Sequence, residues 1–386
     1  MNSPTHACVP ASAIGELSPE EARAAQARGA LLIDVREASE CASGMAEGAI
    51  NVPRGQLDDR MAELFRDPDQ AIVVICAIGQ RSRVAAAALY ALGYHAVSSV
   101  SGGLARWKRD GLPLADDGLD TDARERYARQ LCLPQVGVAG QRRLAAARVA
   151  LIGAGGLGSP AALYLAAAGV GRLSLIDDDV VERSNLHRQV LHTDARVGVA
   201  KVESARTALA ALNPAIGIDA VRERLTAANV ERLLHGHDVV IDGSDNFPTR
   251  YLLAAASRHL RLPMIYGAVE RFSGQISVFD PRREDSPCYR CLFPEPPGPD
   301  DAPNCSEAGV LGVLPGMVGM MQATEALKLI LGIGEPLIGH VLCFDALSMQ
   351  FHRLQLARDP QCPGCGPASH THALIDLSVP ACSTQS

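Results

Sequence analysis

The sequence lacks several features that mark particular classes of protein. It has no basic start followed by a long apolar run, so we expect no secretory signal and a cytoplasmic protein. The most apolar stretch, 310–333, contains Pro315, Glu325 and Lys328, which favours a buried helix over a membrane span. With a net charge of −7, the chain has no excess of positive charge that would indicate a nucleic-acid partner.

Paired cysteines, by contrast, are present. Two C-x-x-C pairs, Cys288/Cys291 and Cys362/Cys365, have the spacing that lets two thiolates bind one metal ion. Four thiolates form a closed tetrahedral site with no position for substrate, so we predict a structural zinc ion that joins two distant segments. The odd total of eleven cysteines favours a reduced compartment over a disulfide framework. Five of the others are interpreted as packing or surface residues: Cys8, Cys41, Cys132, Cys343 and Cys382.

The length of 386 residues allows two ordinary domains. A stretch rich in Gly and Asp, without apolar periodicity, indicates a linker at 116–122. We therefore predict a first domain at 12–115, a second domain at 123–366 and a loosely ordered tail at 367–386.

Helices and strands alternate in both domains, which predicts the α/β class. Before the linker, the predicted strands are 31–35, 71–75 and 96–100, with a helix at 82–92. After it, the predicted strands are 148–152, 172–176, 239–242 and 263–266, and the helices are 157–168, 201–212 and 247–259. The first pattern predicts a small, mostly parallel sheet, and the second is typical of a doubly wound nucleotide-binding domain.

Cys76 is the first candidate for a reactive cysteine. It ends the predicted strand 71–75 and begins a loop that leads into a helix. Backbone N–H groups at a helix N-terminus, together with Arg81, favour a thiolate or a persulfide anion. A buried, inert cysteine at a strand end is the alternative that spacing alone leaves open.

Residues 17–114 resemble a rhodanese domain. The shared motifs are I-D-V-R-E at 33–37, G-A-I-N-V-P at 48–53, the C-x-x-G-x-R-S loop at 76–82, and the glycines before and after Trp107. The resemblance implies a sulfurtransferase that carries sulfane sulfur as a persulfide on Cys76. One departure is the segment 44–47, near which the family often has a histidine.

A glycine-rich loop marks the second domain. Gly153, Gly155, Gly156 and Gly158 follow a predicted strand and open a helix. Such glycines let backbone N–H groups approach phosphate. Asp177 lies 19 residues after Gly158, where it would accept hydrogen bonds from ribose. On its own, this pattern indicates NAD or FAD, so a dehydrogenase is the first alternative.

The residues after Asp177 favour a triphosphate over a dinucleotide. Arg188 and Lys201 supply strong donors for phosphate. Asp245 follows a predicted strand at the carboxyl edge of the sheet, where it would hold Mg²⁺. For each charge taken singly, a solvated loop residue is the alternative.

From about Arg124 to Gly366 the chain is similar to the MoeB/ThiF adenylyltransferases of the ubiquitin-activating superfamily. The shared motifs are R-Y-A-R-Q at 126–130, the glycine loop, the aspartates at 177 and 179, the run 184–189, V-A-K at 199–201, D-N at 245–246 and both C-x-x-C pairs. The resemblance implies zinc on the four paired cysteines and a homodimer in which Arg129 reaches the neighbouring subunit's nucleotide. The predicted nucleotide-binding set is Gly153, Gly155, Gly156, Gly158, Asp177, Asp179, Ser184, Asn185, Leu186, His187, Arg188, Lys201, Asp245 and Asn246.

Cys305 is the second candidate for a reactive cysteine. It lies on a Pro-rich loop before the apolar helix, and a loop thiol can attack an activated carboxyl group. An additional zinc ligand and an inert thiol are the alternatives. The family has a loop cysteine at this position, which implies an acyl or sulfur linkage.

Together these resemblances imply one reaction sequence. Mg-ATP would adenylate the C-terminal Gly-Gly carboxylate of a small ubiquitin-like sulfur carrier, and the Cys76 persulfide would then give a thiocarboxylate. The catalytic set would be Cys76, Cys305, Arg129, Arg188, Lys201 and Asp245. Thiosulfate or a cysteine desulfurase persulfide would supply the sulfur.

The expected carrier is the small subunit of molybdopterin synthase, which would place the protein in molybdenum cofactor biosynthesis. The runner-up is the carrier for thiamine thiazole synthesis, and a carrier for another thio-metabolite is a further option. Two alternatives come from other classes: an NAD-dependent oxidoreductase fused to a sulfurtransferase, and a non-catalytic, zinc-stapled nucleotide-binding scaffold.

Overall fold

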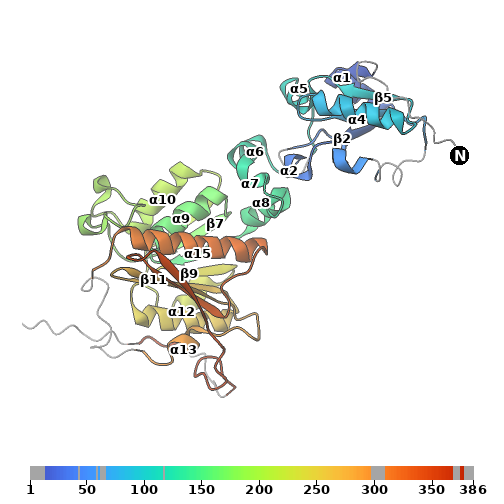
Figure 1. The fold of residues 1–386 in the computed structure, drawn as a ribbon. Helices are drawn as coiled ribbons and strands as arrows, with labels where there is room; N and C mark the ends of the chain where they lie inside the picture. Colours follow the sequence, from blue (N-terminus) through green and yellow to red (C-terminus); the bar gives the residue numbers. More distant parts are fainter. Residues whose placement is uncertain are drawn as a thin grey trace, which may run out of the picture. The chain divides into compact units, whose positions relative to one another are not determined.

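The computed structural model of the protein describes residues 14–41, 44–57, 60, 67–115, 118–296, 309–367 and 374–377. The chain divides into two compact units, Met1–Arg142 and Arg143–Ser386 (Figure 1). The domain limits expected from the sequence, with a linker at 116–122, stay a prediction.

The first unit contains a five-stranded sheet in the order β1-β5-β4-β2-β3, with every pair parallel. Its strands are β1 (Gly15–Leu17), β2 (Leu31–Asp34), β3 (Ile50–Asn51), β4 (Ile72–Ile75) and β5 (Val97–Val100). The prediction of a small parallel sheet is confirmed. The two edge strands, β1 and β3, are too short to show a pattern in the sequence.

Apolar clusters cover both faces of this sheet, which explains why its central strands are continuous apolar runs. Successive residues of β4 point to opposite faces, so Val74 packs with Ile33 in one cluster and Ile75 packs with Trp107 in the other. Helices α1 (Pro19–Ala27), α4 (Gln80–Ala91) and α5 (Gly103–Arg109) complete the two clusters.

The second unit contains an eight-stranded mixed sheet in the order β13-β12-β11-β10-β9-β6-β7-β8. Its strands are β6 (Arg148–Ile152), β7 (Arg172–Ile176), β8 (Gly217–Val221), β9 (Val239–Asp242), β10 (Met264–Glu270), β11 (Ser273–Phe279), β12 (His340–Asp345) and β13 (Gln350–Gln355). The strands from β6 to β10 are parallel, and the direction of winding reverses between β6 and β9. This confirms the predicted doubly wound pattern.

Three antiparallel strands, β11, β12 and β13, extend the sheet beyond β10. The sequence does not predict them. Every residue of β13 is exposed, so this strand has no buried face and lacks the alternation that marks a half-buried strand.

Helices cover both faces of the mixed sheet. Figure 1 shows α9 (Gly158–Ala168), α10 (Lys201–Leu212) and α15 (Val313–Leu331) on one side and α12 (Phe247–Leu260) on the other. The long helix α15 packs against α9, β10 and β11. It is the buried helix predicted within 310–333, and no helix among the described residues is long and apolar enough to cross a membrane.

Part of the predicted loose tail is packed against the second unit. Leu374 and Leu377 lie against an apolar cluster that includes Tyr251 of α12. The Ala227 N–H group donates to an Asp376 carboxylate oxygen at 2.8 Å. The burial of two leucines is the physical reason that residues 374–377 depart from the expected loose tail.

Candidate active site and metal centre

A cavity of about 330 Å³ opens at the carboxyl edge of the parallel strands, where β6 and β9 are neighbours. Doubly wound sheets bind ligands at this position, because the connections after the two strands leave in opposite directions. Three strand ends line the cavity: the glycine loop after β6, Asp177–Asp179 after β7 and Gly243–Asn246 after β9. The fold therefore gathers polar groups of three separate loops around one cavity.

Close backbone contacts require two glycines of the loop after β6. Gly153 has a φ of 92°, and a Cβ atom there would lie 2.7 Å from the Gly243 oxygen. A Cβ atom on Gly158 would collide with the Gly153 oxygen. Without these side chains, the loop can turn tightly into α9, and a phosphate group can approach its backbone.

Asp177 holds the glycine loop through its carboxylate. One oxygen accepts from the Ala154 N–H group at 2.8 Å, and the other accepts from the Asp179 N–H group at 2.8 Å. Burial raises the pKa of Asp177, although Lys201 and these two N–H groups act in the opposite direction. A carboxylate has about four acceptor positions, so capacity remains for ribose hydroxyls.

Arg188 and Lys201 are two of the four cationic side chains that line the cavity, and a neighbouring acceptor holds each of them. Lys201 has a side chain that is 7% exposed, and its Nζ atom lies 2.7 Å from Asp179 Oδ2. Arg188 donates to Asn185 Oδ1 at 2.7 Å. A triphosphate in the cavity would meet both cations and would compete with Asp179 for Lys201.

The loop after β9 brings Asp245 and Asn246 to the same cavity. The Asn246 side chain caps α12 by accepting from the Thr249 N–H group at 3.0 Å. Asp245, in contrast, is exposed. An exposed carboxylate beside a phosphate site suits Mg²⁺, which keeps most of its water and takes few protein ligands.

A buried ion pair behind this loop is a part of the site that sequence reasoning missed. Asp242 is fully buried and lies 3.4 Å from Arg250 Nε, while Arg250 Nη2 donates to the Ser244 oxygen at 2.9 Å. Arg250 also lines the cavity, as do Gln189 and the residues 223–225. In the sequence, only its position could have indicated Arg250, because this residue lies four residues, about one helical turn, after the Asn246 cap.

Cys76 lies in the first unit, directly after β4 in the loop that opens α4. The residue is only 1% exposed. The Gly79 N–H group donates to its sulfur at 3.2 Å, and Ser82 Oγ lies 3.4 Å from the sulfur. Ser82 in turn accepts a hydrogen bond from the Ser99 hydroxyl of β5 at 2.9 Å. The Ser82 hydroxyl itself donates to the Gly79 oxygen at 3.0 Å, so the buried sulfur has one backbone N–H donor and one hydroxyl group beside it.

These contacts decide the protonation of Cys76. Burial raises the pKa of the thiol, but hydrogen bonds from the Ser82 hydroxyl and from backbone N–H groups of the loop outweigh burial and lower the pKa. Arg81, which we expected to favour the thiolate, donates to both carboxylate oxygens of Glu40, at 2.7 and 2.5 Å. The hydrogen bonds of the loop, more than this paired arginine, stabilise the anion.

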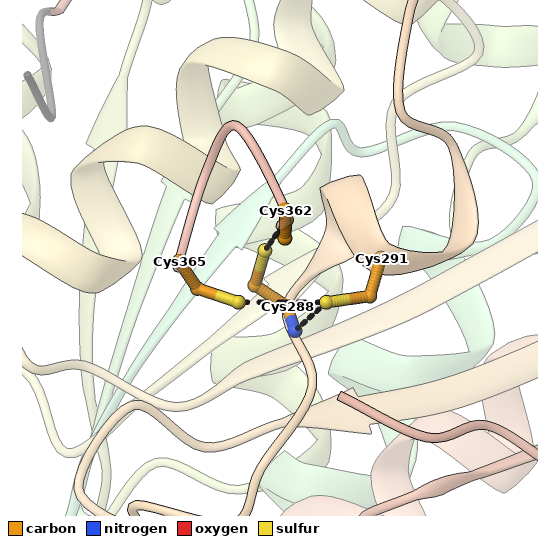
Figure 2. Close-up of side chains that lie close together, drawn as sticks. All are labelled: Cys288, Cys291, Cys362 and Cys365. Atoms are coloured by element: carbon orange, nitrogen blue, oxygen red, sulfur yellow. Dashed lines mark hydrogen bonds between the residues drawn. The ribbon is translucent and has the colours of Figure 1, made fainter. Parts of the chain in front are cut away.

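The four paired cysteines converge from two distant segments, as Figure 2 shows. Their sulfurs all lie within 4.8 Å of one another, with 3.6 Å between Cys288 and Cys362 and 3.4 Å between Cys291 and Cys365. A zinc ion bound by four thiolates at ~2.3 Å holds the sulfurs about 3.8 Å apart. The donor set and spacing therefore fit a zinc site.

The protonation of the four cysteines also favours a metal site. Hydrogen bonding with Cys288 and Cys291 lowers the pKa of Cys365, whereas hydrogen bonding with Cys291 and Cys365 raises the pKa of Cys288. Shared protons can stabilise only part of such a cluster as thiolate, because each proton donated to one sulfur stays on another. A divalent cation stabilises all four thiolates together.

Comparison with known families identifies the larger unit. Residues 127–364 match the ThiF family, and this match covers more than half of the chain. The chain belongs to the ThiF family. Residues 18–110 match the rhodanese-like domain, so this member carries a rhodanese-like domain ahead of its ThiF-family part. Both resemblances predicted from the sequence are thereby confirmed, and with them the class of enzyme, an adenylyltransferase with a sulfurtransferase domain.

Several curated relatives are about half identical to this ThiF-family chain over the aligned residues. A sulfur carrier protein adenylyltransferase of Thermus thermophilus is 51% identical over 258 residues, which are 66% of this chain and 95% of the relative. The SAMP-activating enzyme E1 of Haloferax volcanii is 51% identical over 248 residues, or 64% and 91% of the two chains. The adenylyltransferase and sulfurtransferase MOCS3 of Drosophila yakuba is 47% identical over 262 residues, 68% of this chain but 57% of the relative.

Solved structures agree on the fold. Crystal structures of E. coli MccB resemble the chain, and the one determined with ATP has a TM-score of 0.55 at 22% identity, over 62% of this chain and 74% of MccB. Another, of MccB with a modified MccA peptide, has a TM-score of 0.56 at 21% identity, over 65% and 76% of the two chains. At this identity the likeness concerns the fold alone.

The cavity gathers most of the nucleotide-binding set predicted for this ThiF-family chain. The residues that line it are Gly153, Gly155, Gly156, Asp177, Asp179, Arg188, Lys201, Asp245 and Asn246. Those outside its lining are Gly158, which begins α9, and Ser184, Asn185, Leu186 and His187, which precede Arg188. Arg129 lies exposed in α7 (Ala128–Leu131) of the first unit. The roles assigned to all of these residues stay predictions.

The remaining cysteines divide into described and undescribed positions. Cys305 lies outside the described residues, as do Cys8 and Cys382. Cys41 is buried and accepts from Asn51 Nδ2 at 3.1 Å, and burial raises its pKa to about 12. Cys132 is exposed. A thiol with a raised pKa is a poor nucleophile, so Cys41 suits the packing role expected for it.

Proposed function

We propose that this ThiF-family chain adenylates the C-terminal Gly-Gly carboxylate of a ubiquitin-like sulfur carrier and converts it to a thiocarboxylate. The observation that carries the proposal is the presence, in one chain, of a ThiF-family nucleotide cavity and a rhodanese-like loop that stabilises a cysteine anion. The names of its relatives, a sulfur carrier protein adenylyltransferase and an adenylyltransferase and sulfurtransferase, support both halves of the reaction.

In the first step the carrier's carboxylate is activated. ATP would lie along the glycine loop, with Asp177 at the ribose and with Arg188 and Lys201 at the phosphates. A carboxylate oxygen attacks the α-phosphorus, the bond from that phosphorus to the bridging oxygen breaks, and pyrophosphate leaves. The two cations stabilise the charge that develops on the phosphates. Asp245 is the residue that would hold Mg²⁺, which adds further charge neutralisation, and Arg129 would contribute from a neighbouring subunit of a homodimer.

In the second step sulfur replaces AMP. The terminal sulfur of a Cys76 persulfide attacks the acyl carbon, AMP leaves with the bonding electron pair, and an acyl disulfide joins the carrier to Cys76. The Cys305 thiolate then attacks the Cys76 sulfur and releases the carrier thiocarboxylate. The disulfide left between Cys76 and Cys305 is reduced by an external thiol, and thiosulfate or a cysteine desulfurase persulfide reloads Cys76. In the persulfide the charge lies on the outer sulfur, and N–H groups of the same loop would donate to it there.

Exchange of labelled pyrophosphate into ATP tests the first step. We expect exchange only with a carrier that retains its terminal Gly-Gly, and a loss of roughly 10²–10³-fold in Lys201→Ala, because one cation at the phosphates is removed. Arg206→Ala is the matched control, since Arg206 lies on the same helix and pairs on the surface with Glu203. Exchange that needs no carrier, or hydride transfer to NAD, would contradict the proposal.

The proposed carrier is the small subunit of molybdopterin synthase, on the strength of the MoeB resemblance. The carrier for thiamine thiazole synthesis is the second candidate. Exchange rates measured with the two carriers at equal concentration decide between them. Thiocarboxylate formation with thiosulfate by Cys76→Ala would exclude the persulfide step while leaving adenylation intact.

A further inference from the structure

A hollow of about 400 Å³ lies on the surface of the second unit, and arginine side chains form most of its wall. We call it the arginine pocket. Its lining consists of Arg258, Arg261, Pro281, Arg282, Arg283, Glu284 and Arg358. These residues come from three segments that are far apart in the sequence, so only the fold brings them together.

The arginine pocket is separate from the nucleotide cavity. The start of α12 supplies Asn246, Thr249 and Arg250 to the nucleotide cavity, whereas Arg258 near the end of α12 and Arg261 just after it line the arginine pocket. A helix of 14 residues is roughly 21 Å long. The two sites therefore lie near opposite ends of one helix, and the proposed reaction does not use the arginine pocket.

Carboxylates neutralise only part of the charge in the pocket. Arg282 pairs with Asp280 at 2.7 Å, and Arg283 pairs with Asp285 at 3.0 Å. For Arg258, Arg261 and Arg358, no carboxylate of the described residues lies within salt-bridge distance. Glu284 is the one acidic residue of the lining, so the pocket keeps a net positive charge in a chain whose overall charge is −7.

Contacts with the surrounding chain hold one of these arginines in place, and a buried donor of another lacks an acceptor. Arg358 is fixed by hydrogen bonds to the Glu284 oxygen at 2.6 Å and to the Cys365 oxygen at 2.7 Å. The Nε atom of Arg258 is buried without a hydrogen-bond partner, a state that costs about 1–3 kcal/mol in a typical protein. Arg261 ends α12 with a φ of 53°, which fixes the direction in which its side chain leaves the helix.

We propose that the arginine pocket binds a small oxyanion that carries at least two negative charges, of the phosphate or sulfate class. Guanidinium groups bind such anions through paired N–H donors, and several guanidiniums around one hollow favour multiple charge over a single carboxylate. Pyrophosphate, inorganic phosphate and sulfate share this chemistry, and they differ in charge and size. The anion supplies the acceptors that Arg258 and Arg261 lack within the described chain.

Isothermal titration tests the proposal on the full chain, saturated with a non-hydrolysable ATP analogue so that the nucleotide cavity is filled. We expect pyrophosphate to bind at one remaining site, more tightly than sulfate, and more weakly as salt concentration rises. Arg258→Gln with Arg261→Asn should weaken this binding at least tenfold. Asn tolerates the left-handed backbone at position 261, so this exchange leaves the helix end unstrained.

The control variant is Arg206→Gln with Arg109→Gln, which removes two exposed arginines that pair with acids elsewhere. Bound zinc and an unchanged thermal midpoint confirm that each variant is folded. If the double variant unfolds, Arg358→Gln serves in its place. No binding to the saturated chain, or equal binding by both double variants, overturns the proposal. Tighter binding of a polyglutamate peptide than of pyrophosphate also overturns it and indicates an acidic protein partner. Each of these failures leaves pyrophosphate exchange, and so the proposed function, untouched.

Discussion

At Cys76 a row of hydroxyl groups connects the sulfur with the neighbouring strand. Ser99 donates to Ser82 at 2.9 Å, and Ser82 Oγ lies 3.4 Å from the sulfur. A thiolate has no proton to give, so in the anion we expect the Ser82 hydroxyl, which in this structure donates to the Gly79 oxygen at 3.0 Å, to turn to the sulfur. A hydroxyl that accepts a hydrogen bond is a stronger donor, and Ser99 therefore acts on Cys76 through Ser82.

We predict that Ser99→Ala raises the pKa of Cys76 by roughly 0.1 to 0.7 of a unit. This range follows from a hydrogen bond to a charged group of about 1.5–3 kcal/mol that is weakened by about 10–30%. The ultraviolet absorbance of the thiolate, taken as the difference from Cys76→Ser over a range of pH, measures the pKa without a reagent that must reach the buried sulfur. Ser98→Ala is the control, because adjacent residues of a strand point to opposite faces. An equal pKa in both variants would refute the role of Ser99.

The sequence predicts where a candidate residue lies when a motif marks a strand end. Cys76 and Asp245 are of this kind, because residues that follow a parallel strand lie at the carboxyl edge, and their roles stay predictions. Arg250 and Ser99 could not be read in this way. Each lies within a helix or strand, and only the packing of that element against a loop gives the side chain its contact.

At the scale of elements, the glycine loop combines a special backbone angle with close contact. Gly153 and Gly198 have similar φ angles, 92° and 87°. A Cβ atom on Gly153 would meet Gly243, whereas one on Gly198 would meet nothing within 4 Å. A comparison of these two glycines therefore separates the cost of a strained backbone angle from the cost of disrupting a close backbone contact.

We predict that Gly198→Ala lowers the free energy of unfolding of the second unit by about 1–2 kcal/mol, the cost of a left-handed alanine. Gly153→Ala should cost more, because the Gly243 backbone must also move. It should also weaken ATP binding, which Gly198→Ala should leave unchanged. Urea unfolding and ATP titration give the two quantities. Equal losses of stability in both variants would show that the close approach has no energetic consequence.

His192 contacts the glycine loop after β6 through one nitrogen of its ring. Its Nε2 atom lies 2.9 Å from the Ala154 oxygen, and its Nδ1 atom lies 3.0 Å from Ser204 Oγ. Burial lowers the pKa of His192, so the ring stays neutral in the folded protein at pH values where an unfolded histidine takes up a proton.

Stability should therefore fall on acidification. Below pH ~6.5 the unfolded chain binds a proton that folded His192 does not, so the free energy of unfolding decreases by up to about 1.4 kcal/mol per pH unit until the folded pKa is passed. His192→Gln should flatten this slope when urea unfolding is measured between pH 5 and 7.5. His235→Gln, at an exposed position, should keep it. An unchanged slope in His192→Gln would rule out this histidine as the cause.

The sequence predicts the central elements better than the edges. Strands β4, β6 and β9 are buried on both faces and are visible as short apolar runs. Strand β13 is exposed along its whole length, so hydrogen bonding to β12, and not side-chain burial, determines its place in the sheet.

At the scale of the whole molecule, the cysteine cluster joins segments that 70 intervening residues separate in sequence. We predict that Cys362→Ser with Cys365→Ser removes bound zinc. Closed zinc sites contribute of order 10 kcal/mol in small domains, so the thermal midpoint of the second unit should fall by more than about 10 °C. Metal analysis and calorimetry measure both effects, with Cys343→Ser as the control. Zinc that survives the double exchange would exclude this cluster as its site.

The sequence predicts the positions of the binding sites on the whole molecule least well. The nucleotide cavity could be expected, because parallel strand ends meet at one edge. The arginine pocket could not, since its residues belong to segments around positions 258, 282 and 358 with no shared motif.

The near-complete burial of Cys76 also affects how readily this thiolate is oxidised. Peroxide and other oxidants attack thiolates, and an activated thiolate on an open surface would soon be lost as sulfinic acid. A residue that is 1% exposed offers such reagents almost no access, so a low pKa here need not bring vulnerability. When a second sulfur is attached, the nucleophilic atom lies about 2 Å from the Cys76 sulfur along the new S–S bond. Loading with sulfur therefore places the nucleophile on a different atom from the one that burial protects.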